Sequence, residues 1–321
     1  MTRAGFVALA GRPNVGKSTL VNVVVGEKVA IVSDRPQTTR RAIRGVRTAG
    51  ECQLVLVDLP GVQRPRDALT ARMARRVREE LEGADAALLV LSGEQGVGPG
   101  DRFIARALME SMTHAPPTTI AVNKVDRLSR AGVLAALTDA AGLDLEGEVF
   151  PISARTGEGL EALLAHLEAL LPEGPFLFAA EERSDQPLRL LVAELIREAA
   201  IRRTFQELPH VVEVVVEELT ERRSADRSEI DRSRGTLAFG EHPRFGQHAD
   251  EVHVRALIWV ESASQKGIVI GARGRMIAAI GSAARRELQR ALGCRVHLDL
   301  SVRVRRDWRG DEALLDRLGI G

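Results

Sequence analysis

A glycine-rich segment near the start of the chain has the residue types and spacing needed to hold phosphate groups. Residues 11–18 read GRPNVGKS, which fits G-x-x-x-x-G-K-S, and they lie between an apolar run and a helical pattern. In this setting backbone N–H groups surround phosphate oxygens, and the helix start adds its positive dipole end. We expect Lys17 to reach the β- and γ-phosphates and the Ser18 hydroxyl to bind Mg²⁺. The segment therefore predicts a nucleoside triphosphate ligand.

A second motif predicts the rest of the magnesium shell. The string DLPG at 58–61 follows a buried apolar run, so Asp58 is expected to hold Mg²⁺ through water. The Gly61 N–H is expected to contact the γ-phosphate. The string QTTR lies between the two motifs and can supply a hydroxyl from Thr38 or Thr39. The family pattern described below favours Thr39.

The string NKVD at 123–126 predicts which base is bound. Asp126 can accept two hydrogen bonds from guanine, at N1–H and at the 2-amino group, and adenine offers no such pair of donors. The aliphatic stem of Lys124 can cover the face of the base. After the next apolar run, Ser153 and Ala154 are expected to place the Ala154 N–H at the guanine O6. These residues predict GTP and argue against an ordinary ATP-binding kinase or ATPase.

Short apolar runs alternate with helical patterns through the first half of the chain. Each run is followed by Gly, Asp, Asn or Ser, which is typical of a parallel sheet with helices on both faces. In such sheets ligands bind beyond the carboxyl ends of the strands, so the polar residues above should converge on one site. The predicted strands are Phe6–Ala10, Gln53–Val57, Ala86–Leu91, Thr119–Val122 and Val149–Ile152.

A second unit is predicted after the helix stop and linker at 171–187. Its element order is α-β-β-α-α-β, with a G-x-x-G loop, GARG at 271–274, between its last two helices. The predicted elements are a helix near 188–205, strands at 210–218 and 252–260, helices around 265–291 and a strand at 296–304. By itself a G-x-x-G string carries little information, but this element order is that of a type II KH domain, in which the loop holds a single-stranded RNA backbone.

The bulk composition indicates an ordinary soluble globular protein. The 321 residues are 45% hydrophobic and 28% charged, with a net charge of +1, so net charge indicates no particular partner. The two cysteines, Cys52 and Cys294, lack metal-site or disulfide spacing, so we expect a reducing cytoplasm. The longest apolar runs are too short to cross a bilayer.

Taken together, the strings GRPNVGKSTL, QTTR and NKVD resemble those of the Era family of GTPases, and the resemblance extends to GARG and the basic tail around Trp308. It implies a doubly wound, mostly parallel α/β P-loop sheet followed by an α+β type II KH domain. The implied boundaries are a GTPase domain at 1–171, a linker at 172–187, a KH domain at 188–310 and a C-terminal tail at 311–321.

The resemblance also implies the residues that bind GTP or GDP, the Mg²⁺ ligands and the catalytic residues. The Mg²⁺ ligands would be Ser18, Thr39 and Asp58, and the catalytic residues Lys17, Thr39 and Asn14. The nucleotide-binding residues would be Gly11, Arg12, Pro13, Asn14, Val15, Gly16, Lys17, Ser18, Thr19, Asp58, Leu59, Pro60, Gly61, Val62, Asn123, Lys124, Val125, Asp126, Ser153 and Ala154.

Three positions bear on how fast GTP would be hydrolysed. Val62 stands where other GTPases often carry a glutamine that orients water, so we expect slow turnover. In relatives, an asparagine matching Asn14 helps to hold K⁺ near the phosphates; the alternative is that Asn14 only caps the loop. Leu59 replaces the threonine usual in the family and is expected to point away from the reacting atoms.

For the second unit, the resemblance implies RNA binding by Lys266, Gly271, Ala272, Arg273, Gly274 and Arg275. From Lys266 to Arg309 there are 11 Lys and Arg against 3 Asp and Glu, which favours a polyanion, although a solvated basic face is the alternative. The implied partners are the 3′ end of 16S ribosomal RNA and the 30S subunit, not DNA, with the chain a monomer that acts in small-subunit assembly. Contact with the inner membrane and a link to cell growth and division stay open.

Two other classes of function compete with this interpretation. One is an interaction protein with a structural nucleotide and a protein-binding second unit. The other is a GTPase of tRNA modification or membrane transport, which the absence of a second P-loop disfavours.

Several further features receive conservative interpretations. His242, His248 and His253 lack paired ligand spacing and are expected in a solvated loop. The polar stretch 221–250 could be an extended hairpin or an insertion. Trp259 and Trp308 are expected to pack, with base stacking as the alternative for Trp308.

Overall fold

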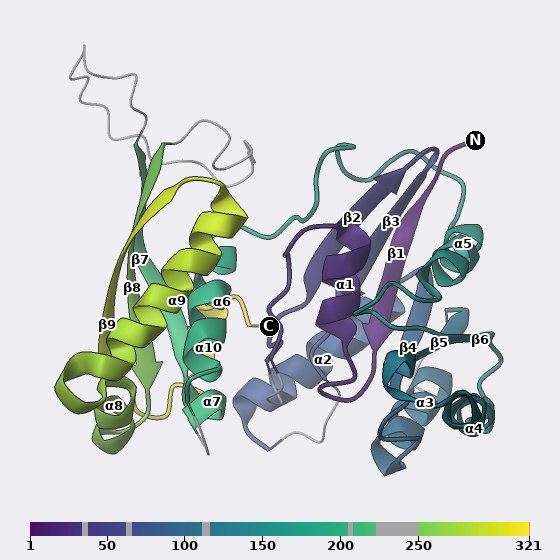
Figure 1. Ribbon diagram of the computed structural model, residues 1–321, viewed down its shortest axis with the longest axis horizontal. Helices are drawn as coiled ribbons and strands as arrows, with labels where there is room; N and C mark the ends of the chain where they lie inside the picture. Colours follow the sequence, from purple (N-terminus) through teal and green to yellow (C-terminus); the bar gives the residue numbers. More distant parts are fainter. Residues whose placement is uncertain (34–37, 62–65, 111–115, 205–207, 223–249, 321) are drawn as a thin grey trace. The chain divides into compact units, whose positions relative to one another are not determined.

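The computed structural model describes residues 1–33, 38–61, 66–110, 116–204, 208–222 and 250–320. They form two compact units (Figure 1). The first contains 1–186 together with the C-terminal residues 308–321, and the second contains 187–307.

The first unit is built on a six-stranded sheet with the order β2-β3-β1-β4-β5-β6. All neighbouring strands are parallel except β2 and β3, so the expected doubly wound, mostly parallel sheet is confirmed. The strand β2 was not predicted, because Arg44, Gly45 and Arg47 interrupt its apolar pattern at the edge of the sheet. The strands are β1 Arg3–Ala10, β2 Ile43–Ala49, β3 Cys52–Asp58, β4 Ala86–Ser92, β5 Thr118–Asn123 and β6 Val149–Pro151.

Helices cover both faces of this sheet. On one face α1 (Lys17–Val25) and α5 (Leu160–Leu170) pack on alternate residues of β1, such as Val7 and Leu9. The other alternate residues, such as Ala8 and Ala10, pack against the remaining helices. These helices are α2 (Ala68–Glu82), α3 (Pro99–Glu110) and α4 (Arg130–Ala141). Because both faces are covered, polar ligands must bind at the strand ends.

The second unit has a three-stranded sheet in which β8 is central, antiparallel to β7 and parallel to β9. The helices α6 and α9 pack on one face of this sheet. The expected element order is confirmed, but the strand predicted from His210 begins at Glu213, because Leu208–Val211 forms the short helix α7. The other elements are α6 Leu188–Ile201, β7 Glu213–Arg222, β8 Glu251–Val260, α8 Ala263–Ile270, α9 Arg275–Leu292 and β9 Arg295–Val304.

The stretch Ala263–Leu292 is the one among the described residues that is long and apolar enough to span a membrane by length and composition. It is not one continuous helix. The backbone breaks between α8 and α9, where Gly271, Arg273 and Gly274 have positive φ angles of 72°, 53° and 77°. A broken backbone of this kind leaves polar groups that lipid cannot satisfy, so this stretch is better explained as two helices of the second unit.

The C-terminal residues pack on the first unit and include a helix that the sequence did not predict, α10 (Glu312–Arg317). Trp308 is fully buried, so its side chain packs and is not available for base stacking. Arg309 forms an ion pair with Asp67 at 3.1 Å, and the Arg309 carbonyl accepts a hydrogen bond from the Leu69 N–H at the start of α2.

Candidate nucleotide site and RNA loop

The phosphate loop joins β1 to α1, and the helix begins at Lys17. Gly16 has φ 104°, and a Cβ atom there would lie 2.2 Å from Asn123 Nδ2, so this position requires glycine. Lys17 is buried, and its Nζ donates to the carbonyl oxygens of Gly11 at 3.0 Å and Arg12 at 3.3 Å. Burial lowers the pKa of Lys17, and the nearby Asp58 carboxylate opposes this shift. A phosphate group would satisfy the lysine more fully than these carbonyls do.

Ser18, Thr39 and Asp58 come together from three separate segments. Ser18 Oγ donates to Asp58 Oδ2 at 2.6 Å, and Thr39 Oγ1 lies 3.4 Å from the same oxygen and 3.2 Å from Ser18 Oγ. Burial raises the pKa of Asp58, and Lys17 and the two hydroxyls oppose this shift.

The other oxygen of Asp58, Oδ1, is shielded from solvent and has no hydrogen-bond partner among the described residues. A buried carboxylate oxygen that lacks a donor fits a bound cation. These three oxygen side chains are the donor set that Mg²⁺ prefers. Their arrangement is therefore suited to a magnesium ion at the phosphate loop.

Two neighbours of Asp58 were also predicted to contact the nucleotide. Leu59 is fully buried in the apolar core that β3 shares with α2 and α3, so its side chain points away from the phosphates. Gly61 lines the cleft beside Pro13. Val62 lies outside the described residues.

Asn123 joins the phosphate loop to the base-binding segments. Its Nδ2 donates to the Val15 carbonyl at 2.8 Å, while its Oδ1 accepts the N–H groups of Lys124 at 2.8 Å and Ala154 at 2.9 Å. The Ala154 N–H, which we expected to face the guanine O6, is thus directed at Asn123 in this structure. A bound base would have to share or displace that hydrogen bond.

Asp126 has both carboxylate oxygens occupied. Oδ1 accepts from Ser153 Oγ at 2.7 Å, and Oδ2 accepts from an Arg155 guanidinium nitrogen at 2.5 Å. The Ser153 hydrogen bond, followed by the Arg155 charge, lowers the pKa of Asp126, so the carboxylate is ionised at neutral pH. The Arg155 side chain is 66% exposed and can move aside for a base. The Ser153 contact fixes the carboxylate in place.

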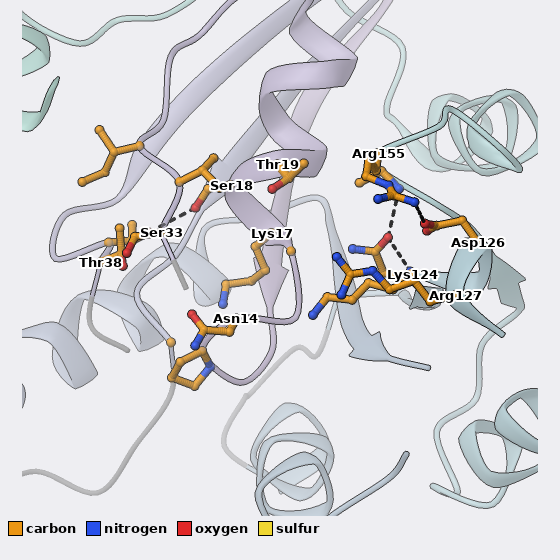
Figure 2. A pocket seen from close by; sticks show the side chains of 18 residues that line it. Asn14, Lys17, Ser18, Thr19, Ser33, Thr38, Lys124, Asp126, Arg127 and Arg155 are labelled. Atoms are coloured by element: carbon orange, nitrogen blue, oxygen red, sulfur yellow. Dashed lines mark hydrogen bonds and ion pairs between the residues drawn. The ribbon is translucent and has the colours of Figure 1, made fainter. Parts of the chain in front are cut away.

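One cleft collects residues from all of these motifs (Figure 2). Lys17 and Ser18 lie on one side of it, and Asp126 and Arg155 lie on the other. The predicted residues that line the cleft are Pro13, Asn14, Gly16, Lys17, Ser18, Thr19, Thr39, Gly61, Asn123, Lys124, Asp126 and Ala154. The lining residues that were not assigned to the site are Ile31, Val32, Ser33, Thr38, Arg127 and Arg155.

Other predicted residues support the cleft without lining it. Arg12 is turned away and pairs with Asp101 at 2.8 Å and with the Gly96 carbonyl at 3.1 Å, which fixes the loop to the start of α3. Val15 and Val125 are buried in the core. Arg127 and Arg155 follow directly after predicted motifs, so extending each motif by one residue would have found them.

The predicted RNA loop lies between α8 and α9. Gly271 has φ 72°, and a Cβ atom there would lie 2.7 Å from the Cβ of Met276, so the turn requires glycine. Arg273 and Arg275 are exposed, and α9 begins at Arg275, so the first turn of a helix adjoins the loop. Free N–H groups at a helix start, beside two arginines, form a setting suited to phosphate.

Known proteins and protein families match both parts of the chain. A family model described as "50S ribosome-binding GTPase" matches residues 6–124, and one described as "KH domain" matches residues 238–309. GTPase Era of Mycobacterium tuberculosis is 40% identical over 317 residues, which is 98% of each chain. GTPase Era of Mycobacterium sp. is 40% identical over 322 residues, covering 99% of this chain and 98% of the relative.

Two solved structures cover 100% of both chains. One is Era in complex with MgGDPNP and nucleotides 1506–1542 of 16S ribosomal RNA, at 31% identity and a TM-score of 0.87. The other is a variant of Aquifex aeolicus Era bound to GDP·AlF₄⁻, at 32% identity and a TM-score of 0.86.

Proposed function

Because the chain belongs to the Era family of GTPases, we propose that it is a GTP-driven switch that binds the 3′ end of 16S ribosomal RNA during assembly of the 30S subunit. Its place of action is the cytoplasm, where ribosomal subunits are assembled. The functional parts we assign are a GTPase domain at 1–171, a linker at 172–187, a KH domain at 188–310 and a tail at 311–321; residues 308–310 pack with the first unit, so they are the point where the KH domain ends and the tail begins.

The observation that carries this proposal is that Lys17, Ser18 and Asp126 line one cleft, with Asp58 hydrogen-bonded to Ser18. Lys17 holds the β- and γ-phosphates, and Asp126 selects guanine over adenine. Asn123 keeps the two ends of the cleft at a fixed separation through its contact with Val15. GTP is the ligand that uses all of these groups together.

Ser18, Thr39 and Asp58 are the residues that would hold Mg²⁺, which when bound neutralises charge on the β- and γ-phosphates. Thr39 belongs to a segment distinct from the phosphate loop, so its contact with the site depends on the nucleotide state. Hydrolysis removes the γ-phosphate and releases this segment. Turnover is slow because Val62 cannot orient water, and we propose that a K⁺ ion beside Asn14 supplies part of the missing charge.

The loop at 271–274 is the proposed RNA contact. Lys266, Arg273 and Arg275 supply positive charge, and the glycines let phosphates approach the backbone. Of the charged side chains on α8, α9 and the loop between them, only Glu287 is acidic, whereas the uncovered face of the sheet carries charges of both signs. RNA is therefore expected on the side of the loop.

Crosslinking of the full chain to cellular RNA tests the proposal. With GTP bound, sequencing should return fragments from the 3′ end of 16S ribosomal RNA, and with GDP the yield should fall. Enrichment of other RNA classes, or of none, would exclude the proposed partner. Co-flotation of the full chain with anionic lipid vesicles separately tests contact with the inner membrane.

A further inference from the structure

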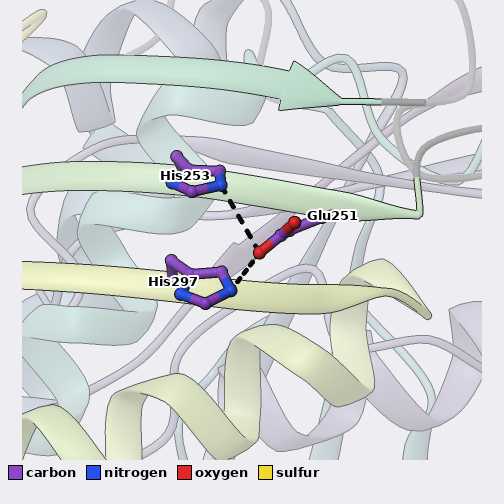
Figure 3. A group of neighbouring side chains, drawn as sticks. All are labelled: Glu251, His253 and His297. Atoms are coloured by element: carbon purple, nitrogen blue, oxygen red, sulfur yellow. Dashed lines mark ion pairs between the residues drawn. The ribbon is translucent and has the colours of Figure 1, made fainter. Parts of the chain in front are cut away.

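Three side chains with metal-binding atoms meet at one end of the sheet in the second unit (Figure 3). His253 on β8 and His297 on β9 are Cα partners across two parallel strands, and Glu251 lies two residues before His253. Residues two apart on a strand point to the same face. The intervening Val252 and the adjacent Val296 are buried towards the helices, so the three polar side chains share the opposite face.

This grouping differs from the one expected from the sequence, where His253 was grouped with His242 and His248. The latter two lie outside the described residues. His253 instead stacks on His297, with ring centroids 4.7 Å apart and an interplanar angle of 13°. The parallel register of β8 and β9 creates this pair, and sequence spacing alone does not reveal it.

The separations suit a small cation. His253 Nε2 lies 3.4 Å from Glu251 Oε1, His297 Nε2 contacts the same oxygen, and the three ligand atoms all lie within 4.8 Å of one another. In a tetrahedral site with ligand bonds of roughly 2.0–2.1 Å, two ligand atoms are about 3.3 Å apart. The distance between His253 Nε2 and Glu251 Oε1 matches this separation between two ligand atoms. The contact between His297 Nε2 and the same Glu251 oxygen is shorter than this separation, so a bound ion would have to move these two atoms apart.

A polar atom of this cluster also lacks a hydrogen bond. His253 Nε2 is shielded from solvent and has no hydrogen-bond partner among the described residues, although it faces Glu251. A neutral imidazole nitrogen and a carboxylate oxygen that face each other as acceptors repel, unless a proton or a metal ion lies between them. Figure 3 shows both imidazole rings with a nitrogen directed at the carboxylate.

We propose that Glu251, His253 and His297 bind a divalent transition-metal ion, with Zn²⁺ the best match. Two imidazoles and one carboxylate are typical zinc ligands, whereas Mg²⁺ and Ca²⁺ prefer oxygen ligands throughout. Water would complete the shell at this open face. Arg222 and Arg295 are the Cα partners of Glu251 on the flanking strands, so their positive charges keep the affinity moderate.

The ion would tie the start of β8 to β9. The strand β7 ends at Arg222 and β8 begins at Glu251, so the site stabilises this end of the sheet, next to residues 223–249, which lie outside the described residues. This role is structural and does not depend on the proposed GTPase cycle or on RNA.

Calorimetry and metal analysis of the full chain test the site. The protein is stripped with a chelator and then saturated with Mg²⁺ and GDP, so that added Zn²⁺ is not counted at the phosphate site. We expect one equivalent of Zn²⁺ per chain, and the double variant His253→Ala/His297→Ala should lose about tenfold or more in affinity. Co²⁺ provides a second readout, because its visible tetrahedral spectrum should appear with the natural chain and disappear with the double variant.

Asp299→Ala is the matched control. Asp299 lies on the same strand and face as His297, two residues further on, and is exposed. Its loss should leave Zn²⁺ affinity and the Co²⁺ spectrum unchanged. The proposal is overturned if the natural chain binds no Zn²⁺ under these conditions, or if the double variant binds it as tightly. An unchanged circular dichroism spectrum shows that the double variant is folded.

Discussion

The guanidinium of Arg40 lies over the indole ring of Trp308, with Cζ 5.3 Å from the ring centroid, and both side chains are buried. Arg40 directly follows Thr39, the proposed magnesium ligand. The next residue, Arg41, donates through Nε to the Leu318 carbonyl at 2.8 Å. The C-terminal residues thus hold the backbone that carries the Thr39 hydroxyl.

The same C-terminal residues also hold the start of α2. Arg72 forms ion pairs with Glu312 and Asp316 and donates to the Ile320 carbonyl at 3.1 Å. The helix α2 follows the 58–61 motif along the chain, so both segments that adjoin the γ-phosphate contacts are fixed by residues that follow β9.

Replacing Trp308 with alanine should weaken this connection. Removing a buried tryptophan leaves a cavity, and the expected cost is about 3–5 kcal/mol of unfolding free energy. Urea unfolding followed by circular dichroism measures it. Because Arg40 loses its packing partner, we also expect weaker Mg²⁺-dependent binding of a GTP analogue. Trp308→Phe keeps an aromatic face and should lose less unfolding free energy. Equal urea midpoints for the natural chain and Trp308→Ala would contradict the packing role.

Asp126→Asn should change the preferred base. The carboxylate is held by Ser153 and accepts from two guanine donors, whereas an amide can pair with only one of them. Loss of a hydrogen bond to a charged group predicts about a tenfold to hundredfold fall in GTP affinity. We expect the affinity for xanthosine triphosphate to rise. Competition binding with fluorescent GDP measures both.

The control for base selection is Arg155→Ala. It removes the exposed ion pair and leaves the Asp126 carboxylate in place, so preference for guanine should persist. If Asp126→Asn kept the GTP affinity of the natural chain, the assignment of Asp126 as the base reader would be wrong.

The sequence predicted the nucleotide motifs because each of them is local. The contact between Asn123 and Val15 follows from strands that end at the same sheet edge, which the alternation of elements already indicated. The edge strand β2 was missed because Arg44 and Arg47 interrupt its apolar pattern, while its pairing with β3 is a long-range property.

The sequence predicted that Trp308 packs, but it did not predict that Trp308 packs on Arg40. It also did not predict that His253 pairs with His297. Both depend on tertiary register, which residue spacing does not encode. The direction of the Ala154 N–H towards Asn123 is also a tertiary contact, because the two residues follow different strands and lie 31 residues apart in the chain.

Gly274→Asp should weaken RNA binding and leave GTP affinity intact. A Cβ atom at Gly274 would meet no atom within 4 Å, so the substitution adds charge without a clash. The positive φ of 77° strains any side chain, and Asn and Asp adopt it more readily than other residues do, so Gly274→Asn is a neutral control that carries a similar backbone strain. We expect a loss of about tenfold or more for Asp and a much smaller one for Asn, measured by RNA filter binding at fixed salt. Equal losses would show that backbone shape matters at this position and charge does not.

GTP hydrolysis should be faster in K⁺ than in Na⁺. An arginine finger contributes roughly 10³- to 10⁵-fold, so a monovalent ion that does part of this work should give at least about a tenfold difference. Asn14 has φ 66°, so Asn14→Gly removes the amide oxygen without straining the loop. This variant should hydrolyse GTP at similar slow rates in both salts. If the natural chain hydrolysed GTP at the same rate in K⁺ and in Na⁺, Asn14 would only cap the loop.

Thr39→Ala and Thr38→Ala form a matched pair that tests the magnesium shell. Both threonines are buried to the same extent, but the Thr39 hydroxyl is the one that lies 3.4 Å from Asp58 Oδ2 and 3.2 Å from Ser18 Oγ. Loss of Thr39 should therefore reduce single-turnover GTP hydrolysis by about 10- to 100-fold, whereas loss of Thr38 should have a small effect. GDP affinity should be similar in both, because we expect the Thr39 hydroxyl to matter when a γ-phosphate is bound beside the magnesium ion. A larger defect in Thr38→Ala than in Thr39→Ala would transfer the ligand role to Thr38, since the two side chains are chemically the same and differ only in where their hydroxyls point.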